Sequence, residues 1–179
     1  MLDFDNYKSE AIKIDTRPIY KSDAESDWFA AWRESGAKPV INEDWNKQIA
    51  ERVANNARHI RIKLLDESNA PAFEIQKCAV QTIYPDQIMA GAEYRFMERA
   101  DFYDLVAKLF PDGWRPNDFW LFDLTEGIEQ FYTEDFAYNN AAPISAEDLP
   151  KYIALRNAVL QLDKLFDIEE FKKRYINIA

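Results

Sequence analysis

The sequence has few of the residues on which common nucleotide-binding and disulfide-bonded folds depend. Only 4 of its 179 residues are glycine, and neither GxGxxG nor GxxxxGKS/T occurs in it. Because both loops need glycine to bring the backbone close to phosphate, we do not expect a P-loop or a fingerprinted Rossmann site. The single cysteine, Cys78, also excludes an intramolecular disulfide and a thiolate metal cluster.

Histidine is equally scarce, since His59 is the only one in the chain. A zinc site usually needs several His or Cys ligands, and no GxSxG-type motif accompanies His59 to indicate a nucleophilic triad. We therefore expect His59 to be a surface residue on a basic strand face rather than a catalytic base. We assign no catalytic residue, metal or cofactor, and we expect Cys78 to be a buried, small apolar side chain.

Long hydrophobic runs are absent as well. No segment approaches the roughly eighteen consecutive apolar residues that a membrane span needs. The opening residues, "MLDFDNYKSE", lack the basic and then apolar pattern of a signal peptide. We therefore expect a soluble, cytoplasmic protein without a membrane partner.

Apolar residues are nevertheless abundant enough to form a core. Hydrophobic residues make up 47% of the chain and aromatic residues 15%, which argues against global disorder. A chain of this length suits one domain. We expect residues 1–20 to be a mixed, irregular N-terminal extension and residues 21–179 to be a single α+β domain.

The order of the elements follows from the spacing of apolar residues. Helical spacing and capping residues predict helices over residues 23–35, 43–57, 70–84, 102–109, 146–166 and 168–175. Alternation predicts strands over residues 59–65, 92–99, 119–122 and 128–133. The last two strands form a hairpin, with Gly127 in a tight turn at positive φ, and "YNNAAP" (138–143) is interpreted as a polar loop. The whole predicts an α+β fold, with a small, mainly antiparallel sheet that has a β-hairpin in its C-terminal half and is packed by several helices.

Basic residues are missing from one long segment. The net charge is −10, and residues 116–150 hold eight acidic residues but no Lys, Arg or His. An acidic protein is repelled by bare phosphate, so we expect no direct nucleic-acid binding. The acidic and aromatic segment can instead dock a basic protein surface, or it can be only the solvated face of a hairpin. The residues proposed to bind a partner are Asp123, Glu126, Glu129, Tyr132, Glu134 and Asp135.

A metal-dependent hydrolase would need carboxylates that converge on one ion. The best candidates are Glu74, Asp118 and Asp123. The two aspartates lie five residues apart on one strand, so their side chains project from opposite faces and do not share an ion without a bulge. Trp120 and Phe122, between them, are expected in the core.

Several short motifs together resemble a known family. They are "RPIY", "HIRIKLLDES", "FEIQ", "AGAEYRFMER" and, as the most specific, "DFWLFD" at residues 118–123. In this order they resemble an uncharacterised domain family that is common in actinobacteria and often encoded beside helix-turn-helix regulators. The family has no established activity, so the resemblance implies no catalytic residues. It does imply a regulatory or partner-binding role.

Three hypotheses about function follow. The leading one is a non-enzymatic interaction or regulatory module that binds a basic protein, such as a helix-turn-helix regulator, through the acidic-aromatic surface. The second is an inhibitor or immunity-type protein that blocks a nucleic-acid-binding enzyme with the same surface. The third is a metal-dependent hydrolase that uses scattered carboxylates.

Overall fold

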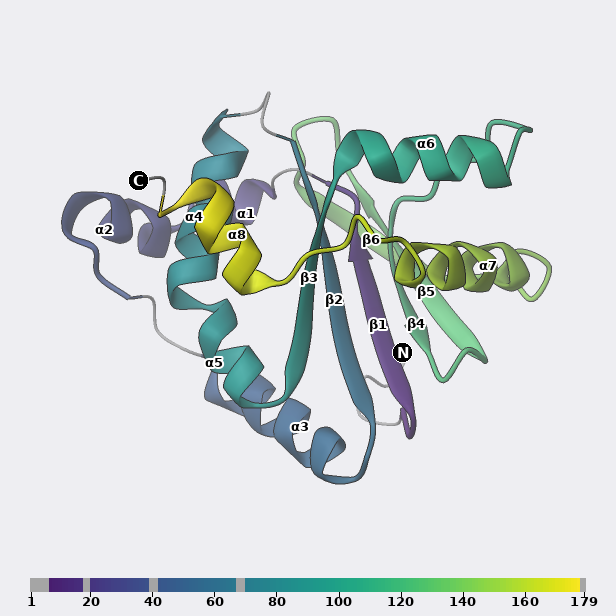
Figure 1. Ribbon diagram of the computed structural model, residues 1–179, viewed down its shortest axis with the longest axis horizontal. Coiled ribbons are helices and arrows are strands. Elements are labelled where there is room, and N and C mark those ends of the chain that lie inside the picture. The colour runs from purple at the N-terminus through teal and green to yellow at the C-terminus, as the bar shows by residue number, and fades with distance from the viewer. Residues whose placement is uncertain (1–6, 18–19, 39–41, 67–69, 178–179) are drawn as a thin grey trace.

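A single six-stranded sheet organises the described part of the chain (Figure 1). The computed structural model describes residues 7–17, 20–38, 42–66 and 70–177. In sheet order the strands are β3 (Ala92–Glu98), β2 (Arg58–Leu65), β1 (Glu10–Asp15), β4 (Asp118–Phe122), β5 (Glu126–Tyr132) and β6 (Tyr138–Pro143).

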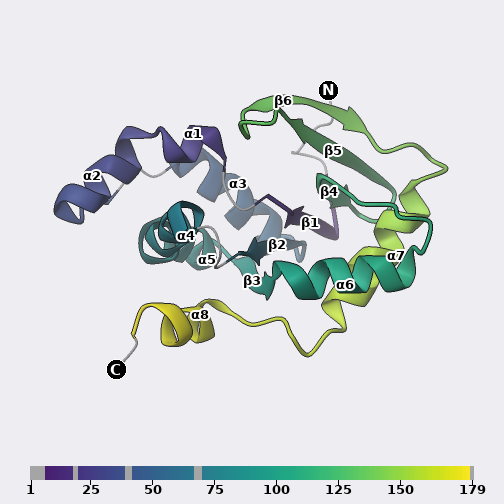
Figure 2. The same ribbon diagram turned by 90° about the horizontal axis from the view of Figure 1, so that it is seen from above.

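Helices cover both faces of this sheet, as Figure 2 shows from above. Helices α6 and α7 lie on one face, while α1, α3 and α4 lie on the other, towards which β5 and β6 curve. Helix α8 packs beside the edge strand β3. The helices are α1 (Lys21–Ala24), α2 (Asp27–Ser35), α3 (Glu43–Ala54), α4 (Ala70–Thr82), α5 (Tyr84–Met89), α6 (Arg99–Leu109), α7 (Leu149–Leu160) and α8 (Ile168–Tyr175).

The sheet is mixed, and antiparallel pairs are in the majority. Strand β2 runs parallel to both β1 and β3, whereas the pairs β1–β4, β4–β5 and β5–β6 are antiparallel. The expected α+β class, the mainly antiparallel sheet and the hairpin in the C-terminal half are therefore confirmed.

The main core lies between the sheet and helices α6 and α7. Alternation along the strands sends Ile12, Ile62 and Phe119 to this face, where they meet Phe102 of α6 and Leu155 of α7. All five side chains are fully buried. This layer accounts for much of the 47% hydrophobic composition.

Local capping signals place several helix ends as expected. The Asn42 side chain accepts a hydrogen bond from the Trp45 backbone N–H at 3.0 Å, and Asp167 does the same for Glu170 at 2.9 Å. Gly36 ends α2 in the left-handed region at φ 70°.

The expectation that residues 1–20 are irregular is wrong for the segment that forms β1. This strand lies in the interior of the sheet, between β2 and β4, and all six of its residues are buried. Glu10, Lys13 and Asp15 give the segment a polar appearance in the sequence, although they are buried with the apolar residues between them.

Two expectations about the hairpin are also wrong. The positive φ angles in the β4–β5 turn belong to Asp123 (51°) and Leu124 (59°). Gly127 lies inside β5, where an added Cβ would be 2.6 Å from the Trp120 carbonyl oxygen, so glycine is needed here for close strand approach. Residues 138–143, expected to be a loop, form the edge strand β6.

The buried position of β1 leads to a stability prediction. Ile12→Ala should lower the free energy of unfolding by about 2–5 kcal/mol, because it leaves a cavity in the main core. Leu109→Ala, at a residue that is 38% exposed at the end of α6, should cost less than about 1 kcal/mol. Urea denaturation of both variants measures the difference. Equal effects would show that β1 does not belong to the core.

Candidate functional site

Five ionisable side chains gather on the sheet face that lies opposite α6 and α7. They come from the central strands β1, β2 and β4. The parallel register sets Lys13 beside Arg61 and Asp15 beside Lys63, so like positions on the two strands become neighbours. We call this group the charge cluster, and its members are Lys13, Asp15, Arg61, Lys63 and Asp118.

Asp15 is the centre of the charge cluster. Its carboxylate is 1% exposed and forms ion pairs with Lys13 Nζ at 2.7 Å, Lys63 Nζ at 2.7 Å and Arg61 Nη2 at 2.9 Å. It also accepts a hydrogen bond from the Tyr20 hydroxyl at 2.7 Å. These contacts satisfy a carboxylate that would otherwise be too costly to bury.

The buried setting changes the acid–base properties of the charge cluster. Burial alone would raise the pKa of Asp15, but the charges of Arg61, Lys13 and Lys63 hold this pKa well below its usual range. Burial lowers the pKa of Lys13, and the nearby Asp15 opposes that shift. Asp15 is therefore ionised at neutral pH.

Asp118 is the second carboxylate that contacts Tyr20, after Asp15. Its Oδ1 accepts hydrogen bonds from the Thr16 backbone N–H and hydroxyl, each at 2.8 Å, and from the Arg17 N–H at 3.2 Å. The Tyr20 hydroxyl lies within hydrogen-bond distance of both Asp15 Oδ1 and Asp118 Oδ2, and the two carboxylates share its single proton. Burial and the two carboxylates raise the pKa of Tyr20 well above its usual value. Tyr20 therefore stays protonated and joins the two acids.

A cavity of about 270 Å³ opens beside the charge cluster, with Arg61 and Lys63 in its lining. We call it the polar cavity. Helices α4 and α5 supply glutamine and tyrosine side chains to its lining, and β3 supplies one tyrosine. The aromatic rings in this lining are Tyr20, Trp28, Tyr84 and Tyr94.

The hydrogen bonds within the lining of the polar cavity involve the glutamine oxygens and leave the glutamine N–H donors without acceptors. The Tyr84 hydroxyl donates to Gln76 Oε1 at 3.3 Å, and the Tyr94 hydroxyl donates to Gln87 Oε1. Neither glutamine Nε2 donates to another described residue, and Arg61 Nε is buried without a partner among the described residues. The polar cavity therefore presents N–H donors and positive charge.

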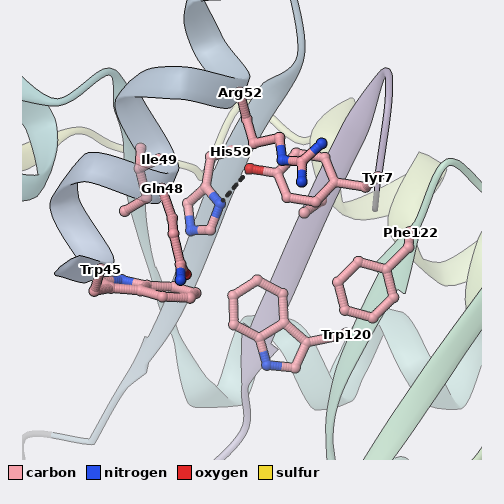
Figure 3. A pocket seen from close by; sticks show the side chains of 9 residues that line it. Tyr7, Trp45, Gln48, Ile49, Arg52, His59, Trp120 and Phe122 are labelled. Atoms are coloured by element: carbon pink, nitrogen blue, oxygen red, sulfur yellow. Dashed lines mark hydrogen bonds between the residues drawn. The ribbon is translucent and has the colours of Figure 1, made fainter. Parts of the chain in front are cut away.

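A second, much smaller pocket surrounds His59 (Figure 3). His59 is 1% exposed, and its Nδ1 lies 3.1 Å from the Tyr7 hydroxyl. The space, about 10 Å³, suits roughly one water molecule. Burial and the charge of Arg61 lower the pKa of His59 to about 3, so the ring is neutral at pH 7.

The expectation of a surface histidine on an exposed basic strand face is therefore wrong. Alternation correctly put His59, Arg61 and Lys63 on one face of β2. That face is covered, however, because α3 and α4 pack over it. Cys78, in contrast, is fully buried as expected, and Trp120 and Phe122 are buried as expected.

The sequence motifs and the fold can now be set beside known families. Residues 3–165 match the model of a domain of unknown function, DUF6879. The chain belongs to this family. The match includes all six strands and every residue of the charge cluster and the polar cavity, and it ends before α8. No curated protein and no solved structure matches the chain.

Membership of DUF6879 confirms the resemblance to an uncharacterised domain family over most of the chain. Actinobacterial origin and a neighbouring regulator gene stay predictions. None of the helices in the described ranges is long and apolar enough to cross a membrane.

Some of the residues predicted to bind a partner in this DUF6879 domain contact other parts of the same chain, and others are exposed. Asp123 accepts hydrogen bonds from the backbone N–H groups of Lys8, Ser9 and Glu10 at 2.7–2.9 Å and from the Ser9 hydroxyl, which together hold the start of β1. Burial opposes ionisation of Asp123, but these bonds outweigh it and lower its pKa to about 2.

Three more of the six predicted residues have internal partners. Glu129 accepts from the Asn117 backbone N–H at 2.9 Å, and the Tyr132 ring lies 5.2 Å from that of Tyr20. Asp135 pairs with Lys21 Nζ at 2.7 Å.

Glu126 and Glu134 are exposed, and neither has an ion-pair partner in the described part of the chain. They remain free to meet a partner. The six residues thus lie along β5 and its flanking turns, yet four of them already contact this chain.

The charge cluster was missed as a group because only long-range pairing assembles it. A weak signal existed in "IKID" and "IRIK", where charged residues alternate with isoleucine in two segments. Isoleucine on one face of an interior strand leaves the charged residues on the opposite face, which is also covered here.

Removing the central carboxylate should destabilise the fold. Asp15→Asn should lower the free energy of unfolding by about 3–5 kcal/mol, because three buried cations lose their counter-ion. Glu74→Gln, which removes only an exposed partner of Lys77, should change stability little.

The same variant should change the response to acid. A carboxyl with a lowered folded-state pKa stabilises the fold above its unfolded value, near 3.9, and this contribution disappears as the pH falls below that value. Wild-type protein should therefore lose more stability between about pH 5 and pH 2 than Asp15→Asn does. Thermal unfolding across this range measures the difference, and parallel curves would contradict an ionised, ion-paired Asp15.

Proposed function

We propose that this DUF6879 domain binds a small, negatively charged molecule in the polar cavity. The observation that supports it best is that Arg61 and Lys63 both line a cavity of about 270 Å³. Small-molecule sites combine aromatic and apolar walls with a few placed polar groups. The polar cavity has this composition, and its cations favour an anionic ligand.

The charge balance supports the same proposal. With all three cations protonated, the charge cluster carries three positive and two negative charges, which leaves one positive charge. A buried charge without a partner is costly. An anion beside Arg61 and Lys63 would balance it, and it would also favour the protonated form of Lys13.

Binding can be tested by thermal unfolding with simple anions. Sodium acetate, phosphate and benzoate are each compared with sodium chloride at the same ionic strength. We expect at least one anion to raise Tm by roughly 5–10 °C at a hundredfold excess over its Kd, because such binding adds about 2.7 kcal/mol. The proposal fails if no anion raises Tm beyond sodium chloride.

Lys63→Met should remove most of this stabilisation, because it takes one cation from the lining of the polar cavity. Lys47→Met is the matched control, since Lys47 lies exposed on α3 and, among the residues that the structure describes, pairs only with Glu51 at 3.9 Å. The control should respond to anions as the wild type does. If both variants respond equally, the anions act elsewhere on the protein.

Docking of a basic protein partner is the second candidate function. Residues 116–150 lack any basic side chain, and Glu126 and Glu134 are exposed beside the edge strand β6. Carboxylates arranged on one side of a sheet steer a basic partner and add specificity. A regulator of the helix-turn-helix type and a nucleic-acid-binding enzyme that this chain inhibits both have the required basic surface.

Charge reversal distinguishes docking from a merely solvated face. Glu126→Lys together with Glu134→Lys should abolish retention of a partner in affinity pulldown from the native host, read by mass spectrometry at roughly 50 and 300 mM salt. The matched control reverses Glu43 and Glu74, which lie on α3 and α4. Docking through this surface is refuted if no partner is retained, or if both double variants retain it equally.

The fold does not bring the carboxylates of the hydrolase hypothesis together. Asp118 and Asp123 lie at opposite ends of β4 and bind opposite ends of the β1 segment. Within the described ranges no three His, Cys, Asp or Glu side chains are placed to hold a metal ion. No residues can therefore be assigned to such an activity.

A further inference from the structure

We infer that the polar cavity takes a planar aromatic carboxylate with a single negative charge. This inference rests on the anion-binding function proposed above and specifies the class of ligand. Four properties of the lining support it: its unused hydrogen-bond groups, its net charge, its aromatic walls and its size.

The hydrogen-bond groups require a ligand that accepts. Tyr84 and Tyr94 direct their hydroxyl protons to the Gln76 and Gln87 carbonyl oxygens, so each of these acceptors already has one donor. The amide N–H groups of both glutamines have no acceptor among the described residues. A carboxylate has two acceptor oxygens and no donor, and it matches this arrangement.

The charge balance favours a ligand with one negative charge. The charge cluster carries an excess of one positive charge when its lysines are protonated. A carboxylate restores neutrality. A phosphate monoester, which carries about −1.5 to −2 at pH 7, would leave a net negative charge in a buried setting.

The walls favour a flat ring. The rings of Tyr84 and Tyr94 stack with centroids 4.2 Å apart and an interplanar angle of 21°, and Tyr20 and Trp28 add two further rings to the lining. Aromatic ligands gain offset-stacked or edge-to-face contacts with such walls, whereas a puckered ring does not.

The volume sets the scale of the ligand. A cavity of about 270 Å³ is far larger than the roughly 10–15 Å³ that one water molecule needs by the same measure. A benzoate with small substituents fits within this volume. The polar cavity therefore suits a single-ring acid.

Four probes separate these properties in a protein NMR titration at about pH 8. Benzoate is the expected ligand. Benzamide removes the charge, cyclohexanecarboxylate removes the planarity, and phenyl phosphate carries nearly two charges because its second pKa is about 6. We expect benzoate to bind at least about tenfold tighter than each of the other three, because benzamide loses the charge-assisted hydrogen bonds, cyclohexanecarboxylate loses the ring stacking and phenyl phosphate exceeds the charge balance.

An isosteric variant tests whether benzoate binding depends on a residue that lines the polar cavity. Gln87→Glu keeps an oxygen that accepts from Tyr94 but replaces the N–H donor with negative charge, so it should weaken benzoate binding at least about tenfold. Gln81→Glu adds the same charge at an exposed position on α4, outside the lining of the polar cavity, and it should change affinity less than about twofold.

The outcomes distinguish this inference from the proposed function. If phenyl phosphate or cyclohexanecarboxylate binds as tightly as benzoate, or if Gln87→Glu leaves benzoate affinity unchanged, the ligand class is wrong while anion binding stands. If acetate, phosphate and all four probes fail to bind, the proposed function is overturned as well.

Discussion

The ion pairs of Asp15 are the interaction on which the rest of this structure depends. Strand β1 places Lys13 and Asp15 inside the sheet, where water cannot solvate them. Each isolated charge would cost several kcal/mol there. Because the parallel register brings Arg61 and Lys63 of β2 beside Asp15, the charges compensate each other, and β1 can occupy the interior of the sheet.

Strand β1 in turn joins two parts of the sheet with different directions. It continues the parallel set with β2 and β3, and it begins the antiparallel set with β4. The motif "DFWLFD" fixes this junction. Asp118 binds backbone N–H groups just after β1, and Asp123 binds those around its start, so one strand holds both ends of its neighbour. The acids that suggested catalysis or docking in the sequence therefore have a structural role.

The helices and most strands could be predicted because their signals are local. Asn42 and Asp167 cap helices within three residues of their partners, and apolar spacing marks the buried faces. Strand β1 and the charge cluster could not be predicted in this way. Their buried charges look like surface residues until β2 and β4 are paired with them, and Asp15 and Arg61 are 46 residues apart. An exposed edge strand such as residues 138–143 carries no apolar pattern either.

The acidic segment at residues 116–150 shows a second limit of prediction from sequence. Sequence can count carboxylates between residues 116 and 150, but it cannot tell an acid that meets solvent from one that accepts backbone hydrogen bonds, as Asp123 does. The distinction depends on which N–H groups the fold leaves without partners. The ends of strands leave backbone N–H groups without a partner, and nearby aspartate side chains are short enough to accept hydrogen bonds from them.

The polar cavity and the acidic surface are connected through one short segment. Tyr20 lines the polar cavity and donates to Asp118, while its ring packs near that of Tyr132. The next residue, Lys21, pairs with Asp135, and its backbone N–H donates to the Phe136 carbonyl at 3.1 Å. A ligand that moves Tyr20 must therefore alter contacts that hold the β5–β6 turn. Coupling of this kind is reciprocal, so a partner bound at the turn would change ligand affinity by the same factor.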